Sequence, residues 1–257
     1  TILVVDDNPD MTDFLKRTFE GYFKRIIIAG DGVEALQLVR SHVPDIIVSD
    51  VMMPRMNGYE LCKTIKEDIA ISHIPVILLT AKDDKQSLIS GYKNGADGYL
   101  SKPFEVEMLM ELIRNRLKNR EYTKKRYLNA GLIPTPEEST ISLTDETFLI
   151  KLNSIIQENI DNTNLGIQFI CQEVGLGRSS LYNKLKALTG MGANEYISKL
   201  RIEKAITLIS GTDMPFSEIA EKTGFTTPSY FSTTFKQYTG ETPSQYKERK
   251  KKGLTDQ

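Results

Sequence analysis

The chain has 257 residues, with 33 Lys and Arg against 34 Asp and Glu, so its formal net charge is −1. Its 40% apolar and 26% charged residues are typical of folded globular proteins and exclude collagen-like and strongly disordered chains. Apolar runs are all shorter than the roughly 18–20 residues of a membrane span, and no cleavable signal peptide is visible. We therefore expect about two domains of a cytoplasmic protein, with no membrane contact by this segment.

Polar side chains directly follow four short apolar runs of the first half. Asp6 and Asp7 come after the first run, Asp50 after the second, Thr80 after the third and Lys102 after the fourth. Continuous apolar runs of this length predict parallel strands that are buried on both faces of a sheet. Ligands bind outside the carboxyl ends of such strands, so we expect these side chains to meet in one crevice. Three carboxylates, a hydroxyl and an ammonium together predict a phosphorylation site.

The charges of this crevice indicate a metal and a nucleophile. Close carboxylates resist ionisation unless a cation neutralises them, and oxygen ligands that act together with phosphate suit Mg²⁺. One carboxylate can then attack a phosphoryl group and form an aspartyl phosphate. We assign that role to Asp50, at the end of the expected central strand. The expected metal ligands are Asp7, assisted by Asp6, together with Asp50 and the backbone carbonyl of Met52.

Lys102 and Thr80 are expected to stabilise the transferred group, because cationic stabilisation and positioning do most of the catalysis in phosphoryl transfer. Lys102 would pair with the phosphoryl oxygens as a point charge, and Thr80 would donate a hydrogen bond to them. A strand-end Asp taken singly is more often a helix cap, and Asp7 before Asn8-Pro9 has that alternative. The five positions taken together favour the phosphorylation site.

Residues 1–119 resemble a response-regulator receiver domain of the CheY-like kind. The matching pieces are the pair Asp6-Asp7, the segment Asp50–Leu61, the turn Leu79-Thr80-Ala81, the segment Asn94–Asp97 and the segment Tyr99–Phe104. The resemblance implies a (βα)₅ doubly wound parallel sheet, Mg²⁺, and phosphotransfer to Asp50 from a histidine kinase or histidine phosphotransfer domain. It also implies a cis peptide bond before Pro103, and a rotamer change of Tyr99 together with Thr80 on phosphorylation.

The pattern changes between the two halves of the chain. Charged residues 120–126 continue the last helix of the first half, and Gly131, Pro134 and Pro136 then break the periodicity. Such a composition predicts a turn-rich linker. The expected division is a receiver domain over 1–119, a linker over 120–143, a helical domain over 144–250 and a tail over 251–257.

The second half predicts an all-helical domain with an internal duplication. Two units, which begin at Ile167 and Phe216, each consist of a short helix, a turn with Gly and a second helix that ends before Thr-Gly. This is helix-turn-helix organisation. A periodic apolar helix over residues 193–210 separates the units. The corresponding pairs, about 50 positions apart, are Gly175 with Gly224, Leu181 with Phe231, Leu185 with Phe235 and Gly190 with Gly240.

Residues 144–249 resemble an AraC/XylS-type DNA-binding domain, on the duplicated units, the segment Leu200–Ala205 and the run Ile219–Tyr246. The resemblance implies binding of operator DNA in the major groove, usually by two protomers and usually to activate transcription, with RNA polymerase as a further partner. By alignment, the groove-facing positions of the first recognition helix are Ser179, Tyr182, Asn183 and Lys186, and Arg178 stands at the start of that helix. The groove-facing positions of the second recognition helix are Ser229, Ser232, Thr233 and Lys236.

This half is neutral, with 12 Lys and Arg against 12 Asp and Glu over residues 144–250. Non-specific affinity for DNA comes from neutralised phosphates, so we expect it to be modest. Phosphorylation of Asp50 would attract Thr80 and Lys102 and remodel a receiver face. Pairing of that face in a homodimer would raise the effective concentration of one DNA-binding module beside the other. The expected face comprises residues 83–94, 97–102 and 105–118.

Two other function classes stay open, and we expect no enzyme activity beyond self-catalysed phosphotransfer. A phosphatase that passes through an aspartyl phosphate would place its nucleophile after the first strand, at Asp6 or Asp7. A pure interaction module would bind protein and show no salt-sensitive binding to duplex DNA. The chain starts with Thr1 and not Met, which fits one further implication of the resemblance, an origin as the C-terminal part of a hybrid sensor kinase.

Overall fold

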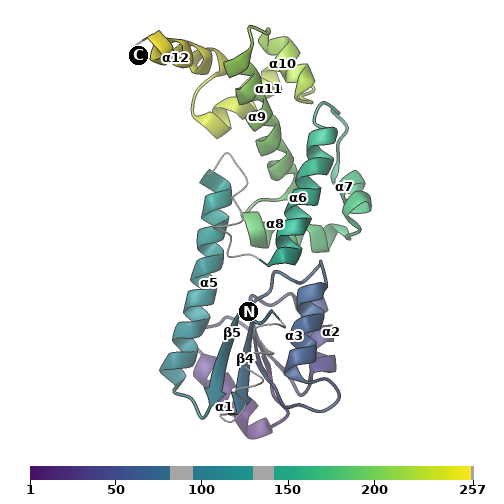
Figure 1. Cartoon of the computed structure of the whole chain (residues 1–257), viewed down its shortest axis with the longest axis vertical. Coiled ribbons are helices and arrows are strands. Elements are labelled where there is room, and N and C mark those ends of the chain that lie inside the picture. The colour runs from purple at the N-terminus through teal and green to yellow at the C-terminus, as the bar shows by residue number, and fades with distance from the viewer. Residues whose placement is uncertain (82–94, 130–141, 256–257) are drawn as a thin grey trace. The chain divides into compact units, whose positions relative to one another are not determined.

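The structure is a computed structural model, and it describes residues 1–81, 95–129 and 142–255. The chain forms two compact units (Figure 1), one of the described residues of 1–147 together with 186–190, and the other of residues 148–185 and the described residues from 191 onward. Across these described ranges, none of the helices combines the length and the apolar character that a membrane crossing requires.

The first unit contains one five-stranded sheet in the order β2-β1-β3-β4-β5, and every pair of neighbouring strands is parallel. This confirms the predicted doubly wound parallel sheet, with β3 at its centre. The strands are β1 (Ile2–Val5), β2 (Ile26–Ala29), β3 (Ile46–Asp50), β4 (Val76–Ala81) and β5 (Gly98–Lys102). The helices are α1 (Pro9–Phe19), α2 (Gly32–His42), α3 (Gly58–Glu67) and α5 (Val106–Asn129).

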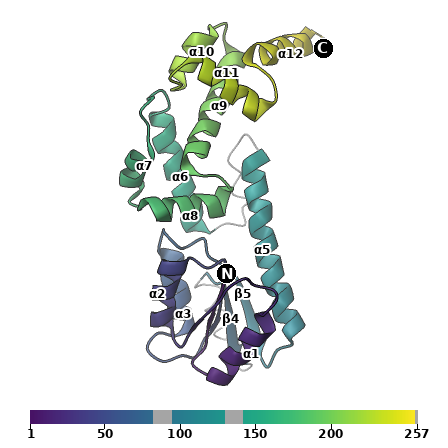
Figure 2. The same cartoon turned by 180° about the vertical axis from the view of Figure 1, so that it is seen from behind.

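Alternate residues of the central strands pack on opposite faces of the sheet. Leu3 and Ile47 belong to the core on the side of α2 and α3, whereas Val4 and Val48 belong to the core on the side of α1 and α5. All four side chains are fully buried, and Figure 2 shows helices on both faces of the sheet. Burial of a Val, Leu or Ile side chain contributes roughly 1.5–3 kcal/mol, so these apolar runs account for the layered fold.

Helix α3 begins directly against the end of the central strand. The Gly58 N–H donates to the Val51 carbonyl at 2.9 Å, and a Cβ built on Gly58 would lie 2.2 Å from the Asp50 carbonyl oxygen. Asn57 caps the helix, because its Oδ1 accepts from the Glu60 N–H while the Glu60 side chain accepts from the Asn57 N–H. The absence of a side chain at position 58 therefore lets the start of α3 approach the backbone of Asp50.

Helix α5 extends beyond residue 119, the predicted end of the first domain. It continues from Val106 to Asn129 and so takes up residues 120–129 of the segment assigned to the linker. No Gly or Pro interrupts the sequence before Gly131, and the helix-favouring residues Glu121 and Lys124 form an ion pair at 2.5 Å. The prolines of the expected linker lie outside the described residues, and the domain boundaries stay predictions.

The second unit is all-helical, as predicted. Its two helix-turn-helix pairs are α7 with α8 and α10 with α11, and α9 connects the pairs (Figures 1 and 2). The helices are α6 (Leu143–Glu158), α7 (Ile167–Val174), α8 (Arg178–Thr189), α9 (Ala193–Gly211), α10 (Phe216–Lys222), α11 (Pro228–Thr239) and α12 (Pro243–Thr255).

The predicted duplication is visible in the backbone. Gly175 and Gly224, in the turns of the two helix-turn-helix pairs, both have φ +72°. Glycine adopts this left-handed conformation without the steric penalty that other residues pay, and helices commonly end at such a residue. The corresponding core residues, Leu181 with Phe231 and Leu185 with Phe235, are all 0% exposed.

Replacement of Gly58 by Ala is expected to lower the free energy of unfolding of the first unit by about 2 kcal/mol, because the added Cβ would press on backbone atoms. Urea denaturation measures the change. Gly30→Ala is the matched control, since the atom nearest to its added Cβ is Glu34 Oε2 at an ordinary 3.7 Å. Equal midpoints for the two variants would contradict the close approach at Asp50.

Candidate phosphoacceptor site and nucleic-acid interface

The register of the sheet places the predicted polar residues at one edge. Strand β1 pairs with β3 so that Val5 lies opposite Ser49, which brings Asp6 beside Asp50 at the next position. On the other side, Asp50 pairs with Leu79 of β4, the residue before Thr80. Carboxyl ends of parallel strands form the ligand-binding edge of such sheets, and the predicted crevice is therefore located there.

Lys102, the last residue of β5, reaches both acids. Its Nζ lies 2.5 Å from Asp50 Oδ1 and 2.8 Å from Asp6 Oδ2. The two acids are buried, with 7% and 3% of their surface exposed. Burial acts to lower the pKa of Lys102, but the hydrogen bonds and charges of Asp50 and Asp6 outweigh it and raise that pKa above its usual value. The side chain is therefore an ammonium at neutral pH.

The other oxygen of each carboxylate is held by the main chain. Asp50 Oδ2 accepts from the Met52 N–H at 2.8 Å, and Asp6 Oδ1 accepts from the Asn8 N–H at 2.9 Å. Charge-assisted hydrogen bonds of this kind are stronger than neutral ones. Each acid is thus oriented by a main-chain N–H on one oxygen and by Lys102 on the other.

The remaining predicted residues lie at or just beyond the carboxyl ends of β1, β3 and β4 and differ in exposure. Thr80 is 4% exposed, and its hydroxyl is 3.4 Å from the Ala81 carbonyl oxygen. Asp7 is exposed, and Met52 is 73% exposed. Asp7 was expected to be the main metal ligand, whereas it is Asp6 that pairs with Lys102. The roles of these residues at a metal stay predictions.

Two features implied by the resemblance concern β5 and the residue after it. The Lys102-Pro103 peptide bond is cis, as expected. Tyr99 pairs with Leu78 of β4, and it is half-buried against the core on the side of α2 and α3. The expected rotamer change of Tyr99 stays a prediction, and residues 83–94 of the expected pairing face lie outside the described residues.

The site fits Mg²⁺ in the nature of its donors. In the part of the chain that the structure describes, no three Asp, Glu, His or Cys side chains form a group that could hold a metal. Asp6 and Asp50 nevertheless converge on one cation, the Lys102 ammonium. Mg²⁺ typically uses one or two carboxylates and completes its shell with phosphate oxygens and waters, and these two acids meet that requirement.

The loop after Asp50 is held by a contact that the sequence analysis missed. Asp31 caps α2, with Oδ1 accepting from the Val33 N–H at 2.8 Å, and its other oxygen pairs with Arg55. The adjacent Gly32 N–H donates to the Met56 carbonyl at 3.2 Å. A capping Asp was recognisable before the apolar run of α2, but its partner is 24 residues away and no local pattern indicates it.

The predicted DNA-contacting residues occupy one face of each recognition helix. Their spacing of three, four and seven residues places them together on a helix surface, and the opposite face of each helix is buried in the core. The exposed members are Arg178, Ser179, Tyr182 and Lys186 in α8 and Ser229, Thr233 and Lys236 in α11, and the half-buried members are Asn183 and Ser232. Their contact with DNA stays a prediction.

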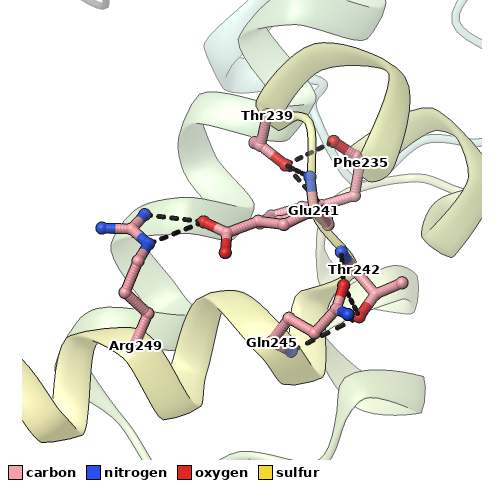
Figure 3. Close-up of polar contacts among 6 residues, drawn as sticks. All are labelled: Phe235, Thr239, Glu241, Thr242, Gln245 and Arg249. Carbon is pink, nitrogen blue, oxygen red and sulfur yellow. Dashed lines mark hydrogen bonds and ion pairs between the residues drawn. The ribbon is translucent and has the colours of Figure 1, made fainter.

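Two basic residues of α12, Arg249 and Lys247, form ion pairs with acids of the same unit. Arg249 donates from Nε and Nη2 to Glu241 Oε1 at 2.9 and 2.6 Å (Figure 3). Lys247 lies 3.2 Å from Asp213. Figure 3 also shows Gln245 beside Thr242, whose N–H donates to Gln245 Oε1 at 2.9 Å. These pairs reduce the local positive charge that the tail would offer to a phosphate backbone.

Known families match both halves of the chain. The response regulator receiver domain matches residues 2–114, and a helix-turn-helix domain matches residues 170–249. Histidine kinase P4 of Formosa agariphila is 41% identical over 249 residues, which make up 97% of this chain and 18% of that protein.

Other relatives match the first half. The DNA-binding response regulator MtrA of Mycolicibacterium smegmatis is 37% identical over 130 residues, 51% of this chain and 56% of that protein. The hybrid signal transduction histidine kinase D of Dictyostelium discoideum is 40% identical over 114 residues, 44% of this chain and 7% of that protein. The chain thus spans 18% of the length of the first of these three relatives and about half of the second.

Replacement of Lys102 by Met is expected to lower the free energy of unfolding by about 2 kcal/mol in Mg²⁺-free buffer, because two buried carboxylates would lose their shared cation. A further Asp50→Asn substitution should restore much of the loss. Lys63→Met is the control, since Lys63 pairs with Glu67 at 3.9 Å on the exposed surface, where ion pairs contribute little. If Lys102→Met behaves like this control in urea denaturation, Lys102 does not balance the two acids.

Proposed function

We propose that this chain, which belongs to the response regulators with a receiver domain followed by an AraC-type helix-turn-helix domain, is a phosphorylation-controlled, sequence-specific regulator of transcription. The observation that carries the proposal is the Lys102 ammonium bound to both Asp50 and Asp6 at the edge of the sheet. A buried carboxylate beside a cation is a suitable acceptor for a phosphoryl group, because the same cation can stabilise the transferred charge.

Asp50 accepts the phosphoryl group in this proposal. One of its carboxylate oxygens attacks the phosphorus of a phosphohistidine, an O–P bond forms and the P–N bond breaks. The electron pair of that bond goes to the imidazole nitrogen, which takes up a proton. The donor is a histidine kinase or a histidine phosphotransfer domain, which the relatives named as histidine kinases support.

Mg²⁺ would supply further positive charge for the transfer. When bound, the ion neutralises the acidic edge and the phosphoryl oxygens, so that an anionic group can approach an anionic nucleophile. The groups that would hold it are Asp6, Asp7, Asp50 and the main-chain carbonyl of Met52.

Lys102 and Thr80 convert the new charge into a change of structure. Lys102 is shared between two carboxylates before phosphorylation, and a dianionic group on Asp50 would be a stronger partner for it. Thr80, one residue beyond the strand partner of Asp50, would donate its hydroxyl to the phosphoryl oxygens. Tyr99 would then move into the space that Thr80 leaves, and the receiver face would pair with its copy on a second chain.

The helix-turn-helix units read the operator. The exposed residues of α8 and α11 would enter successive major-groove segments, with Asn183 as the candidate for an adenine edge. Because the helical half is electrically neutral, a single chain would bind weakly, and pairing of receivers would supply the missing affinity. MtrA, which resembles the first half, is named a DNA-binding response regulator. Activation through RNA polymerase is part of the same proposal.

Incubation of the chain with Mg²⁺ and acetyl phosphate is expected to add one phosphoryl group at Asp50, which intact-mass and peptide mass spectrometry detect. Asp50→Asn should abolish the addition. Asp45→Asn should retain it, because Asp45 is an exposed acid that precedes β3. Omission of Mg²⁺ should slow the reaction, since the acidic edge would then repel the donor.

The position of the label separates this function from the enzyme alternative. Labelling at Asp6 or Asp7, together with steady release of phosphate, would favour a phosphatase. An unmodified protein after treatment with acetyl phosphate and with a panel of histidine kinases would contradict the phosphoacceptor role.

Lys236→Ala and Asn183→Ala are expected to affect DNA binding differently. Loss of the Lys236 charge should weaken binding to all duplexes alike and reduce the slope of log affinity against log salt by about 1. Loss of the Asn183 amide should relax the preference at one base pair by about 1–3 kcal/mol. Fluorescence anisotropy on a set of single-base variants measures both effects. Lys222→Ala, at an exposed position of α10, is the control that should bind as wild type.

A complete lack of salt-sensitive duplex binding by the wild-type chain, with and without phosphorylation, would instead indicate that the helical half binds protein.

A further inference from the structure

Arg201 is a charged residue in the interior of the helical unit. It lies on α9, the helix that connects the two helix-turn-helix pairs, and only 9% of its surface is exposed. A buried charge is costly unless hydrogen bonds or partners compensate it. Arg201 has one partner in the segment before the first helix-turn-helix pair and another in the turn of the second pair.

On one side, the guanidinium holds the segment that leads into the first helix-turn-helix pair. Nη2 of Arg201 donates to the main-chain carbonyl of Asn162 at 2.6 Å. Asn162 lies between the end of α6 and the start of α7. A charge-assisted hydrogen bond to a main-chain oxygen fixes the position of this segment relative to α9.

On the other side, the same guanidinium meets the turn of the second pair. Its central carbon lies 6.0 Å from the centroid of the Phe225 ring, within the range of a cation–π interaction. Phe225 in turn packs against Phe231 of the second recognition helix, with ring centroids 5.3 Å apart. A displacement of the guanidinium would therefore be transmitted to the core of α11.

The turn of the second pair also approaches the segment between α6 and α7 directly at this point. A Cβ built on Gly224 would lie 2.7 Å from Arg201 Nη2 and 2.3 Å from the carbonyl oxygen of Ile160, at the end of the α6 region. The turn of the second pair therefore rests on main-chain atoms that precede the first pair, with the guanidinium beside them. Such a close fit restricts relative movement of the two pairs.

Other contacts attach α9 separately to α6 and to the second pair. The Tyr196 hydroxyl donates to Asn153 of α6 at 2.8 Å, and the Tyr238 hydroxyl of α11 donates to the Glu195 carbonyl at 2.9 Å. These bonds fix one neighbour each. Arg201 differs because one side chain contacts both neighbours.

We propose that Arg201 is a positioning residue that fixes the second recognition helix relative to the first, and that it thereby determines the half-site spacing that the chain accepts. The inference rests on the proposed DNA-binding function. Insertion of one base pair moves the second half-site by about 3.4 Å and rotates it by about 34°. A rigid connection gains avidity only at the spacing it matches, whereas a loosened connection tolerates several.

The experiment uses the full chain and a duplex that the wild-type chain selects from a random-sequence pool. Affinity is then measured for this duplex, for duplexes with one, two or five base pairs inserted between the half-sites, and for each half-site alone. The variants are R201M, which removes the charge, R201K, which keeps the charge without the planar fork, and F225L, which removes the ring. K204A, at an exposed position of α9, is the matched control, and thermal unfolding reports whether each variant is folded.

Wild type and K204A are expected to lose at least about tenfold in affinity on insertion of one base pair. R201M should bind the parent duplex about tenfold more weakly than wild type does. It should bind the inserted duplexes as tightly as it binds the parent duplex. Its affinity for single half-sites should stay within about twofold of the wild-type value. R201K and F225L should show a partial loss of the same spacing preference. This pattern is not expected from a general loss of stability, which would weaken half-site binding as well.

A folded R201M that keeps the spacing preference of wild type would overturn this inference and leave the proposed function intact. If R201M does not unfold cooperatively, R201K and F225L decide, and wild-type spacing preference in both would overturn the inference. Failure of the wild-type chain to enrich any duplex would instead overturn the proposed function, and the inference with it.

Discussion

The Lys102 ammonium, placed between the carboxylates of Asp50 and Asp6, is the interaction on which the functional edge of the first unit depends. Two buried carboxylates on one edge of the sheet repel each other unless a cation lies between them. Parallel strands supply the three groups from residues far apart in sequence, and the register of β1 with β3 brings the acids together. Because Lys102 serves both acids, any new charge on Asp50 must change how Lys102 is shared.

The same edge is connected to the surrounding helices through the backbone. Gly58 lets α3 start against the Asp50 carbonyl, and the pair of Asp31 with Arg55 holds the loop between β3 and α3 to the start of α2. These contacts fix Asp50, the proposed acceptor, in a confined environment. In such an environment, a change of charge is relieved by movement of Lys102 and Thr80 more readily than by movement of the strand.

The helical unit uses its charges differently from the first unit. Its recognition faces carry short polar side chains and few cations, and Arg249 and Lys247 of α12 are paired with Glu241 and Asp213. Arg201 is used inside the unit, between the two helix-turn-helix pairs. Weak attraction to phosphates combined with a fixed arrangement of recognition helices would favour selectivity over affinity, and in the proposed mechanism the pairing of receivers supplies the affinity.

Much of this organisation was predictable from local patterns. Apolar runs that end in Asp50, Thr80 and Lys102 located the edge of the sheet, and the spacing of Gly175 and Gly224 located the two turns. The choice of Asp6 over Asp7 as the partner of Lys102 was not predictable, because consecutive residues after a strand point in opposite directions and the turn at Asn8 decides between them.

Long-range pairs of side chains could not be predicted from the sequence either. The contacts of Arg55 with Asp31 and of Arg201 with Asn162 join residues that share no periodic pattern. The linker was expected to begin at residue 120, although residues 120–126 were expected to continue the last helix, and helix-favouring residues extend α5 to Asn129.

The most direct test of the central interaction is an NMR titration of the Lys102 side chain in Mg²⁺-free buffer, with Asp50→Asn as the comparison. Lys102 is expected to titrate at higher pH than the exposed lysines, and Asp50→Asn is expected to move the pKa of Lys102 back toward its ordinary value. A Lys102 that titrates at or below the pH of the exposed lysines, and does not respond to Asp50→Asn, would contradict the account.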